Sequence, residues 1–383
     1  ELKYEEAISD QLYNHIYDQS TVSLVMKEKD SPPYAHILER GEYDKPGEKV
    51  FADVPESLGG LPASAPKNRM GLAQWLVDGE NPLTARVTVN RFWQNIFGTG
   101  IVATSEDFGI MGENPTHPEL LDWLAIHFRE SRWNVKDFLK LLVMSATYRQ
   151  DSRIDVEELV IDPENRYLAR GLRYRLDGEV LRDKALFVSG SLNGRMGGPP
   201  VKPYQPGGIW NAVAYSDSNT AHFFQDHGED LYRRSLYTFW KRTAPPPNMV
   251  VFDVPSRENC NVRRERTNTP LQALTLMNDK QYVEAARRLA ERVMLSDQSS
   301  VERRIENMYR HAFGSDASPK HQAILEESYR KFQSSFAEQR SDAESLIMVG
   351  DSIPNPSLNP IELASLTMVA NQIMNLDSFV NKY

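Results

Sequence analysis

The chain has 383 residues, of which 40% are hydrophobic and 25% charged, and its formal net charge is −9. That length suits one large domain or two smaller ones, and the composition is ordinary for a globular protein. The acidic balance argues against a nucleic-acid partner, which needs a broad basic surface, and no apolar run reaches the roughly 20 residues that span a bilayer.

The first part of the chain is expected to stand apart from the main domain. Residues 1–30 carry a helical pattern of apolar positions, which predicts a helix. Residues 31–67 hold many of the prolines and glycines, which predicts an extended strap wrapped over the rest. A mainly helical domain is then expected over residues 68–383.

Helix starts recur through that domain. Capping residues, two of them followed by proline, mark expected starts at Asn68, Asn81-Pro82, Asn134 and Thr269-Pro270. In the last of these helices, Leu271, Leu274 and Met277 are expected to face inward because they recur at helical spacing.

The middle of the chain departs from this helical pattern. Residues 193–230 are rich in glycine and proline and are expected to form a long irregular loop. Strand candidates follow at residues 235–240 and 249–253. We therefore predict a mainly α fold: a compact multi-helix domain with a small β hairpin or sheet and long irregular loops.

An arginine cluster is the first candidate site in this acidic chain. Its members are Arg257, Arg263, Arg264 and Arg266. They precede the helix start at Thr269, where free backbone N–H groups favour anions, and guanidinium groups bind carboxylate, phosphate or sulfate through paired donors. The alternative is that internal ion pairs tie this loop to Glu258, Glu265, Asp253 and the helices.

Aromatic and histidine side chains near the cluster are candidates to complete such a site. Trp240 and Tyr237 precede the cluster and can stack on a sugar ring or a guanidinium. The irregular middle segment adds Tyr204, Trp210, His222 and His227. We expect this segment to be ordered, with its rings packed, Tyr215 and Phe224 included, and to share a pocket with the arginines. The alternative is a surface excursion without a partner.

The sequence provides little support for a catalytic cysteine or for a metal site. Cys260 is the only cysteine, which excludes an internal disulfide and a cysteine-based zinc site. A catalytic thiol would need a base beside it, so a buried or crosslinked cysteine is the preferred interpretation. The acidic segment 217–230 fits no known metal-binding loop, and no metal site is predicted. No CxxCH motif occurs, so a c-type haem would belong to another domain or partner.

Three long motifs resemble a known family: YRRSLYTFWKRTAPPP, FDVPSRENCNVRRERTNTPLQALTLMND and the segment from NRMGLAQWL to HPELLDWLA. Over roughly residues 33–383, the chain resembles the C-terminal domain of unknown function in planctomycete multidomain proteins, where it follows a cytochrome c domain of the PSD type. The resemblance implies that residues 1–30 are the end of the preceding domain or a linker helix. The resemblance implies an exported protein, periplasmic or extracellular, in the company of proteins that degrade polysaccharides and sulfate esters. It supplies no reaction and no catalytic residue.

Two functions from different classes follow. The first is a module that binds, and in a stronger form also processes, an anionic extracellular polymer such as a sulfated or uronic-acid polysaccharide. The second is a non-catalytic scaffold or docking domain for a haem c-bearing partner or domain, to which an acidic surface is suited. The sequence leaves open whether the chain is an enzyme, and it predicts no nucleic-acid partner, no membrane span and no cofactor held by this chain.

Overall fold

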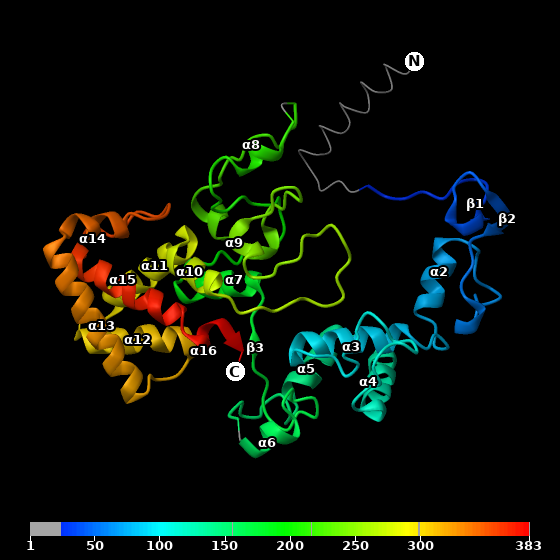
Figure 1. Cartoon of the computed structure of the whole chain (residues 1–383), viewed down its shortest axis with the longest axis horizontal. Coiled ribbons are helices and arrows are strands. Elements are labelled where there is room, and N and C mark those ends of the chain that lie inside the picture. Colours follow the sequence, from blue (N-terminus) through cyan, green and yellow to red (C-terminus); the bar gives the residue numbers. More distant parts are fainter. Residues whose placement is uncertain (1–23, 155, 216, 298, 383) are drawn as a thin grey trace. The chain divides into compact units, whose positions relative to one another are not determined.

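The computed structural model describes residues 24–154, 156–215, 217–297 and 299–382, so most of the helix predicted in residues 1–30 lies outside the described residues. The chain forms two compact units (Figure 1). Unit 1 combines the chain up to Thr88 with Trp123–Trp133, and unit 2 holds Val89–Asp122 and everything from Asn134 onward. Two helices, α3 (Thr84–Phe97) and α4 (Pro118–Glu130), contribute residues to both units.

Unit 1 contains a β hairpin and a capped helix. The antiparallel strands β1 (Tyr34–Leu38) and β2 (Pro46–Phe51) are joined through a 3-10 turn, η1 (Glu39–Gly41), and a second 3-10 turn, η2 (Glu56–Leu58), follows. Helix α2 (Arg69–Leu76) begins at Asn68, whose side chain accepts hydrogen bonds from the N–H groups of Met70 and Gly71, as expected for an N-cap. The predicted extended strap therefore includes a hairpin, and the domain boundary at residue 67 stays a prediction.

The core of unit 2 is built around α15 (Pro360–Met374). This helix is apolar on all sides and buries Leu363, Leu366, Val369 and Ile373 completely, which is typical of a central helix. The helices in contact with it are α11 (Lys280–Ser296), α12 (Val301–Phe313), α13 (Pro319–Glu338) and α14 (Arg340–Ile347), together with α10 (Pro270–Asn278) and α16 (Asp377–Val380). Figure 1 shows α11 to α14 arranged around α15.

The remaining elements of unit 2 are short. The helices are α5 (Val135–Met144), α6 (Val156–Ile161), α7 (Gly178–Val188), α8 (Ile209–Val213), α9 (Pro247–Val250), α10 (Pro270–Asn278) and α16 (Asp377–Val380). Two strands of two residues each, β3 (Tyr174–Arg175) and β4 (Asn381–Lys382), pair antiparallel. The middle of the chain adds the 3-10 turns η3 (Gly228–Tyr232) and η4 (Ser235–Tyr237). The prediction of a mainly α fold with a small hairpin and long irregular loops is confirmed.

Two buried arginines hold the irregular middle segment in place. Arg182 of α7 donates to the backbone carbonyls of Leu231 and Arg233, both at 2.8 Å. Arg233 in turn donates to the carbonyl of Pro199 at 2.8 Å and to that of Gly197. Because both guanidinium groups are buried, these bonds replace the apolar packing that a Gly- and Pro-rich loop lacks.

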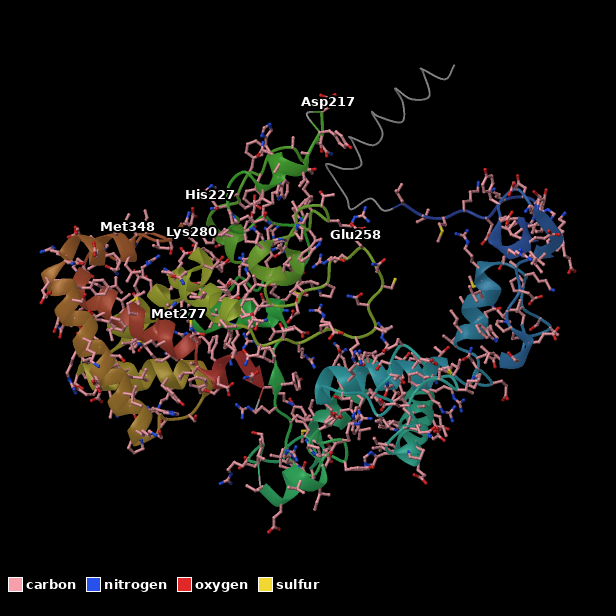
Figure 2. All side chains as sticks on the ribbon, in the orientation of Figure 1. Asp217, His227, Glu258, Met277, Lys280 and Met348 are labelled. Carbon is pink, nitrogen blue, oxygen red and sulfur yellow. The ribbon has the colours of Figure 1, made fainter. Side chains whose placement is uncertain are left out.

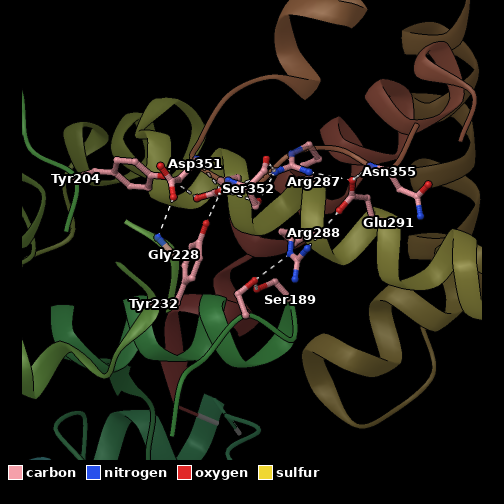
Figure 3. A network of polar contacts seen from close by, with 12 residues as sticks. Ser189, Tyr204, Gly228, Tyr232, Arg287, Arg288, Glu291, Asp351, Ser352 and Asn355 are labelled. Atoms are coloured by element: carbon pink, nitrogen blue, oxygen red, sulfur yellow. Dashed lines mark hydrogen bonds and ion pairs between the residues drawn. The ribbon is translucent and has the colours of Figure 1, made fainter. Parts of the chain in front are cut away.

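A buried carboxylate, Glu284 of α11, organises a second polar network (Figure 3). Its Oε2 accepts from the Tyr204 hydroxyl at 2.8 Å, and its Oε1 accepts from the Tyr232 hydroxyl at 2.8 Å and the Ser352 N–H at 2.8 Å. Burial and the adjacent carboxylate raise the pKa of Tyr232 to about 12. Gly350 permits this geometry, because a Cβ at that position would lie 2.3 Å from Cδ of Glu284.

The strand predictions at residues 235–240 and 249–253 are wrong. Residues 235–237 form the 3-10 turn η4, and the second candidate coincides with α9 and the turn after it. Only isolated bridges occur there among the described residues, between Asn193 and Arg233 and between Val201 and Thr238. The prolines at 245–247 prevent a continuous ladder because proline lacks the N–H donor and fixes φ.

Some burial predictions are also wrong. In α10, Leu271, Leu274 and Met277 are exposed, whereas Gln272 and Leu276 of the same helix are buried. The Gln272 side chain donates to the carbonyl of Val251 at 2.9 Å and so turns the other face of the helix inward.

Two rings expected to pack are also on the surface, because Tyr215 is 89% and Phe224 is 71% exposed. The middle segment is ordered through Arg182 and Arg233 instead of through those rings.

Because of Lys184, the free energy of unfolding of unit 2 changes with pH in the alkaline range. Burial lowers the pKa of Lys184 from 10.5 to about 8, although its ammonium group donates to the carbonyl of Phe379 at 2.8 Å. Between those two pH values the folded amine has released its proton and the unfolded amine has not, so the free energy of unfolding rises with pH. We expect Lys184→Met to remove about 1–2 kcal/mol of this rise, allowing for partial exposure, in urea unfolding between pH 7.5 and 9.5.

The control for this experiment is Lys320→Met, because Lys320 is exposed on α13. That variant should keep the wild-type slope of unfolding free energy against pH. Equal slopes of unfolding free energy against pH in all three proteins would show that the amine of Lys184 keeps its proton in the folded protein over this pH range.

Candidate anion-binding site

The arginine cluster lies on a loop whose base is closed by hydrogen bonds. Asp253 accepts from the backbone N–H and the hydroxyl of Thr267, both at 2.8 Å. Thr269 caps α10 in a capping box with Gln272, as predicted at this helix start. Residues 254–266 therefore form a closed loop of irregular backbone between α9 and α10.

Three arginines of this loop line a pocket together with residues of α3. The pocket lies within unit 2 and has a volume of about 400 Å³. Its lining residues are Arg91, Gln94, Asn95, Asp177, Asn261, Val262, Arg263, Arg264 and Arg266. This cavity is called the arginine pocket below. Four guanidinium groups and one carboxylate belong to the lining, so its charge favours an anion.

Two of the four arginines are held by carboxylates of this chain. Arg264 forms a paired contact with the carboxylate of Glu179, at 2.7 and 3.2 Å, and lies 3.6 Å from Asp177. Burial alone would lower the pKa of Arg264, but the bond to Glu179 raises it. Arg266 donates to the carbonyl of Gly98 at 3.2 Å and lies 4.4 Å over the ring of Tyr174. Arg266 also lies 3.7 Å from Asp177, so both side chains have carboxylate partners at the start of a helix, as the alternative of internal ion pairs to the helices allowed.

The other two arginines keep donors for a ligand. Arg91 is exposed, and among the residues that the structure describes it has no hydrogen-bond or ion-pair partner. Arg263 is 50% exposed, and its Nη2 lies 3.9 Å from both Glu106 and Glu265, at the outer limit of an ion pair. Such long, exposed ion pairs contribute little energy, so Arg263 can turn toward an anion at low cost.

Arg257 belongs to a second, more open pocket together with Tyr237 and Trp240. This cavity of about 520 Å³, the tryptophan pocket below, is lined by Gly198, Pro200, Leu236, Tyr237, Thr238, Phe239, Trp240, Arg242 and Arg257. The guanidinium of Arg257 lies 4.6 Å over the ring of Trp240, whose N–H donates to the carbonyl of Ser256 at 2.9 Å. The indole and Arg257 thus form a stacked wall.

Tyr204 and Trp210 are structural in their environment. Tyr204 is buried and donates to Glu284 at 2.8 Å. Trp210 is 1% exposed and contacts the rings of Phe223 and Phe239 at centroid distances of 5.2 and 5.5 Å. Neither lines the arginine pocket or the tryptophan pocket. Their assignment as ligand-binding residues stays a prediction without support from these linings.

The two histidines have partners of their own. His222 contacts the amide of Asn211 at 2.8 Å, and His227 contacts the carboxylate of Asp351 at 2.6 Å. Neither lines either pocket, and Figure 2 shows His227 well apart from Glu258 of the arginine-bearing loop. The middle segment reaches the tryptophan pocket only through its glycine and proline at residues 198 and 200.

Cysteine and metal chemistry do not extend this site. Cys260 is exposed, so the interpretation as a buried cysteine is wrong; its thiol is free within the described chain, and a crosslink to another chain stays a prediction. Within the described ranges, no group of three or more His, Cys, Asp and Glu side chains is arranged to hold a metal ion. None of the described helices combines the length and the apolar character that crossing a bilayer requires.

The residues of α3 that line the arginine pocket were not predicted from the sequence. Arg91, Gln94 and Asn95 share one helix face, since they are spaced by three and four residues, and that spacing was the available signal. Asp177 and Glu179, at the start of α7, fall under the expected ion pairs to the helices, but the sequence did not single them out by position.

Comparison with known proteins identifies a family but no function. Residues 68–329 match the model of the PSD1 family, described as protein of unknown function (DUF1553). No curated protein and no solved structure matches the chain significantly. The matched region holds both pockets and more than half of the chain. The chain therefore belongs to the PSD1 family of proteins of unknown function.

Proposed function

We propose that this chain is a module that binds an anionic extracellular polymer, a sulfated or uronic-acid polysaccharide, through the arginine pocket. The observation that carries the proposal is the lining: four arginines and three side-chain amides, with Asp177 as its single acidic residue among those described. Guanidinium groups hold sulfate and carboxylate through paired N–H donors, and the amides of Gln94 and Asn95 add neutral donors.

The tryptophan pocket supports a polymer of sugars over a free inorganic anion. Trp240 and Tyr237 offer flat apolar rings that can cover the C–H face of a sugar. Arg257, in the same lining, lies on the same loop as Arg263, so one loop contributes to both pockets. A polymer presents several rings and anionic groups in series, which suits two neighbouring sets of contacts.

Export and the planctomycete context are supported by sequence motifs alone. The motifs quoted above resemble domains of exported planctomycete proteins that accompany polysaccharide- and sulfate-ester-degrading proteins. That context favours sulfated or uronic-acid polysaccharides among anionic polymers. The proposal is one of binding and assigns no catalytic residue.

The test is binding of fucoidan, a sulfated polysaccharide, and of polygalacturonate to the whole chain. We expect Arg91→Ala combined with Arg263→Ala to weaken binding by about tenfold to a hundredfold, since each lost charged contact is worth about 1–1.5 kcal/mol. Calorimetry at low and at high salt measures the effect, and salt should weaken wild-type binding because these side chains are exposed.

The matched control is Arg330→Ala with Arg340→Ala. Both arginines are exposed and form i,i+4 ion pairs on α13 and α14, outside either pocket. This control has the same net charge as the pocket variant and should bind the polysaccharides like the wild type. Equal losses of polysaccharide affinity in both variants would show that binding depends on the overall charge of the protein and not on the arginine pocket. Co-purification of a haem protein without polysaccharide binding would favour the docking-domain alternative.

A further inference from the structure

A third cavity in unit 2 has a different character. It has a volume of about 300 Å³ and is bounded by the end of α3, the turn that follows it, Thr116, His117, Ser152, Ile154, Leu159 and the loop of residues 163–174. It is called the Arg170 pocket below. It shares Arg266 with the arginine pocket, but neither Arg91 nor Arg263, the two arginines with donors left for the polysaccharide, belongs to its lining.

The side chain of Arg170 is the distinctive feature of this cavity. It is 8% exposed, and its Nη2 donates to the carbonyls of Asp162 and Pro163, both at 3.0 Å. Its Nη1 is buried and has no hydrogen-bond partner among the described residues. No carboxylate of the described part of the chain forms an ion pair with it.

A buried guanidinium without a counter-ion is costly. Transfer of a charge from water into a protein interior is penalised by several kcal/mol unless an opposite charge and complete hydrogen bonding compensate it. Two carbonyls satisfy part of Arg170, but they neutralise no charge. An anion bound in the cavity would supply the missing acceptor and the missing charge together.

The local backbone fixes Arg170 in this position. The side chain of Asn165 accepts from the backbone N–H of Arg170 at 3.3 Å and donates to its carbonyl at 2.9 Å. The Asp162 carboxylate is engaged elsewhere, by the backbone N–H groups of Arg166 and Tyr167 at 2.8 and 2.7 Å. The carboxylate of Asp162 is therefore occupied by backbone donors.

The rest of the lining combines positive charge with apolar surface. Further arginines of the lining are Arg166, Arg173 and Arg266, against the carboxylate of Glu164. The apolar part includes Trp93 and Phe97, whose rings stack at 4.1 Å, together with Ile154, Leu159, Leu168, Leu172 and Tyr174. Such a lining suits a ligand with one anionic end and one apolar body.

We propose that the Arg170 pocket binds a small organic carboxylate with a flat apolar body, and that Arg170 is its counter-ion. The cavity volume lies at the lower end of the range for ligand sites, which limits the ligand to about ten non-hydrogen atoms. The aromatic wall selects a flat ring, and the guanidinium selects the carboxylate.

The test uses the whole chain and three probes: benzoate, its neutral isostere benzamide, and acetate. Ligand-detected NMR and calorimetry should show benzoate binding at least about tenfold more tightly than benzamide or acetate. Arg170→Met should weaken benzoate by about tenfold or more, and Arg170→Lys should restore part of the affinity. Comparable affinity of benzamide and benzoate would overturn the proposal.

A second variant protects the test against misfolding of the Arg170 variants. Ile154 lines the cavity and is 51% exposed, so Ile154→Trp should fold and fill the entrance. Val160→Trp, at an exposed position outside the lining, is its control. Retained benzoate binding in a folded Ile154→Trp protein would contradict the proposal. Because Arg91→Ala with Arg263→Ala leaves this cavity intact, benzoate binding should survive in that variant.

Discussion

Gly350→Ala is expected to lower the free energy of unfolding by about 3–4 kcal/mol, whereas Gly314→Ala should cost about 1 kcal/mol. Both glycines have a positive φ, at 108° and 70°. An added Cβ at Gly314 meets open space, so only the left-handed backbone is penalised. At Gly350 the Cβ would lie 2.3 Å from Cδ and 2.5 Å from Oε1 of Glu284, which must then leave its place.

The larger effect follows from the hydrogen bonds that Glu284 would lose. Its Oε1 accepts from the Tyr232 hydroxyl and from two backbone N–H groups and a hydroxyl at residues 351 and 352, at 2.7–2.9 Å. Arg287, which is completely buried, lies 3.7 Å from the same oxygen. Donors that lose a buried acceptor each cost about 1–3 kcal/mol, so displacement of one carboxylate exceeds the backbone penalty.

Urea unfolding of four proteins measures this coupling: wild type, Gly350→Ala, Glu284→Ala and the double variant. Truncation of Glu284 removes the atoms that obstruct an alanine at 350. In that background the alanine should cost no more than it does at Gly314, which gives a coupling energy of about 2 kcal/mol. Equal costs of the Gly350 and Gly314 substitutions in the wild-type background would contradict this geometry.

Arg182→Met is the second substitution with a large expected effect, about 3–5 kcal/mol. The guanidinium is buried and donates to the carbonyls of Leu231 and Arg233, to the hydroxyl of Ser235 at 3.2 Å and to Gln281 at 3.1 Å. Methionine has a similar volume and no donor. The carbonyls would remain buried without partners, or the segment around them would open.

Local opening of this segment can be distinguished from global unfolding by experiment. We expect limited proteolysis of Arg182→Met to cut within residues 193–240 before the rest of unit 2, and amide exchange there to accelerate. Arg234→Met is the control, because Arg234 neighbours this network in sequence and is exposed. If both variants resisted protease like the wild type, the order of the middle segment would have to come from another source.

Local signals in the sequence were reliable. The caps at Asn68, Asn134 and Thr269 could be predicted because a cap depends on a side chain and N–H groups two or three residues away. Helical periodicity was less informative for α10, where one stripe holds Leu271 and Leu274 and another holds Gln272. A long-range hydrogen bond from Gln272 decided which stripe is buried, and no local pattern encodes that bond.

Only the part of the candidate site that lies on one loop could be predicted, because the other residues come from distant parts of the sequence. Arg263 and its neighbours stand together in the sequence, so their grouping was visible. Arg91 lies on α3, far from them in the sequence, and the carboxylate of Glu179 that neutralises Arg264 is 85 residues away. Arg182 and Arg233 resemble surface arginines in the sequence, because burial of a guanidinium on backbone carbonyls leaves no compositional mark.

The short pairing of β3 with β4 has a consequence for the order in which unit 2 is completed. Arg173 binds Asp377 across 204 residues, and Lys382 lies 3.7 Å over the ring of Tyr148. During synthesis, residues 173–175 leave the ribosome long before their partners exist. The strand pairing of Tyr174, a wall of the Arg170 pocket, is therefore completed only after α15 and α16 have been made, although its hydroxyl can already bond to the carbonyls of residues 95 and 96.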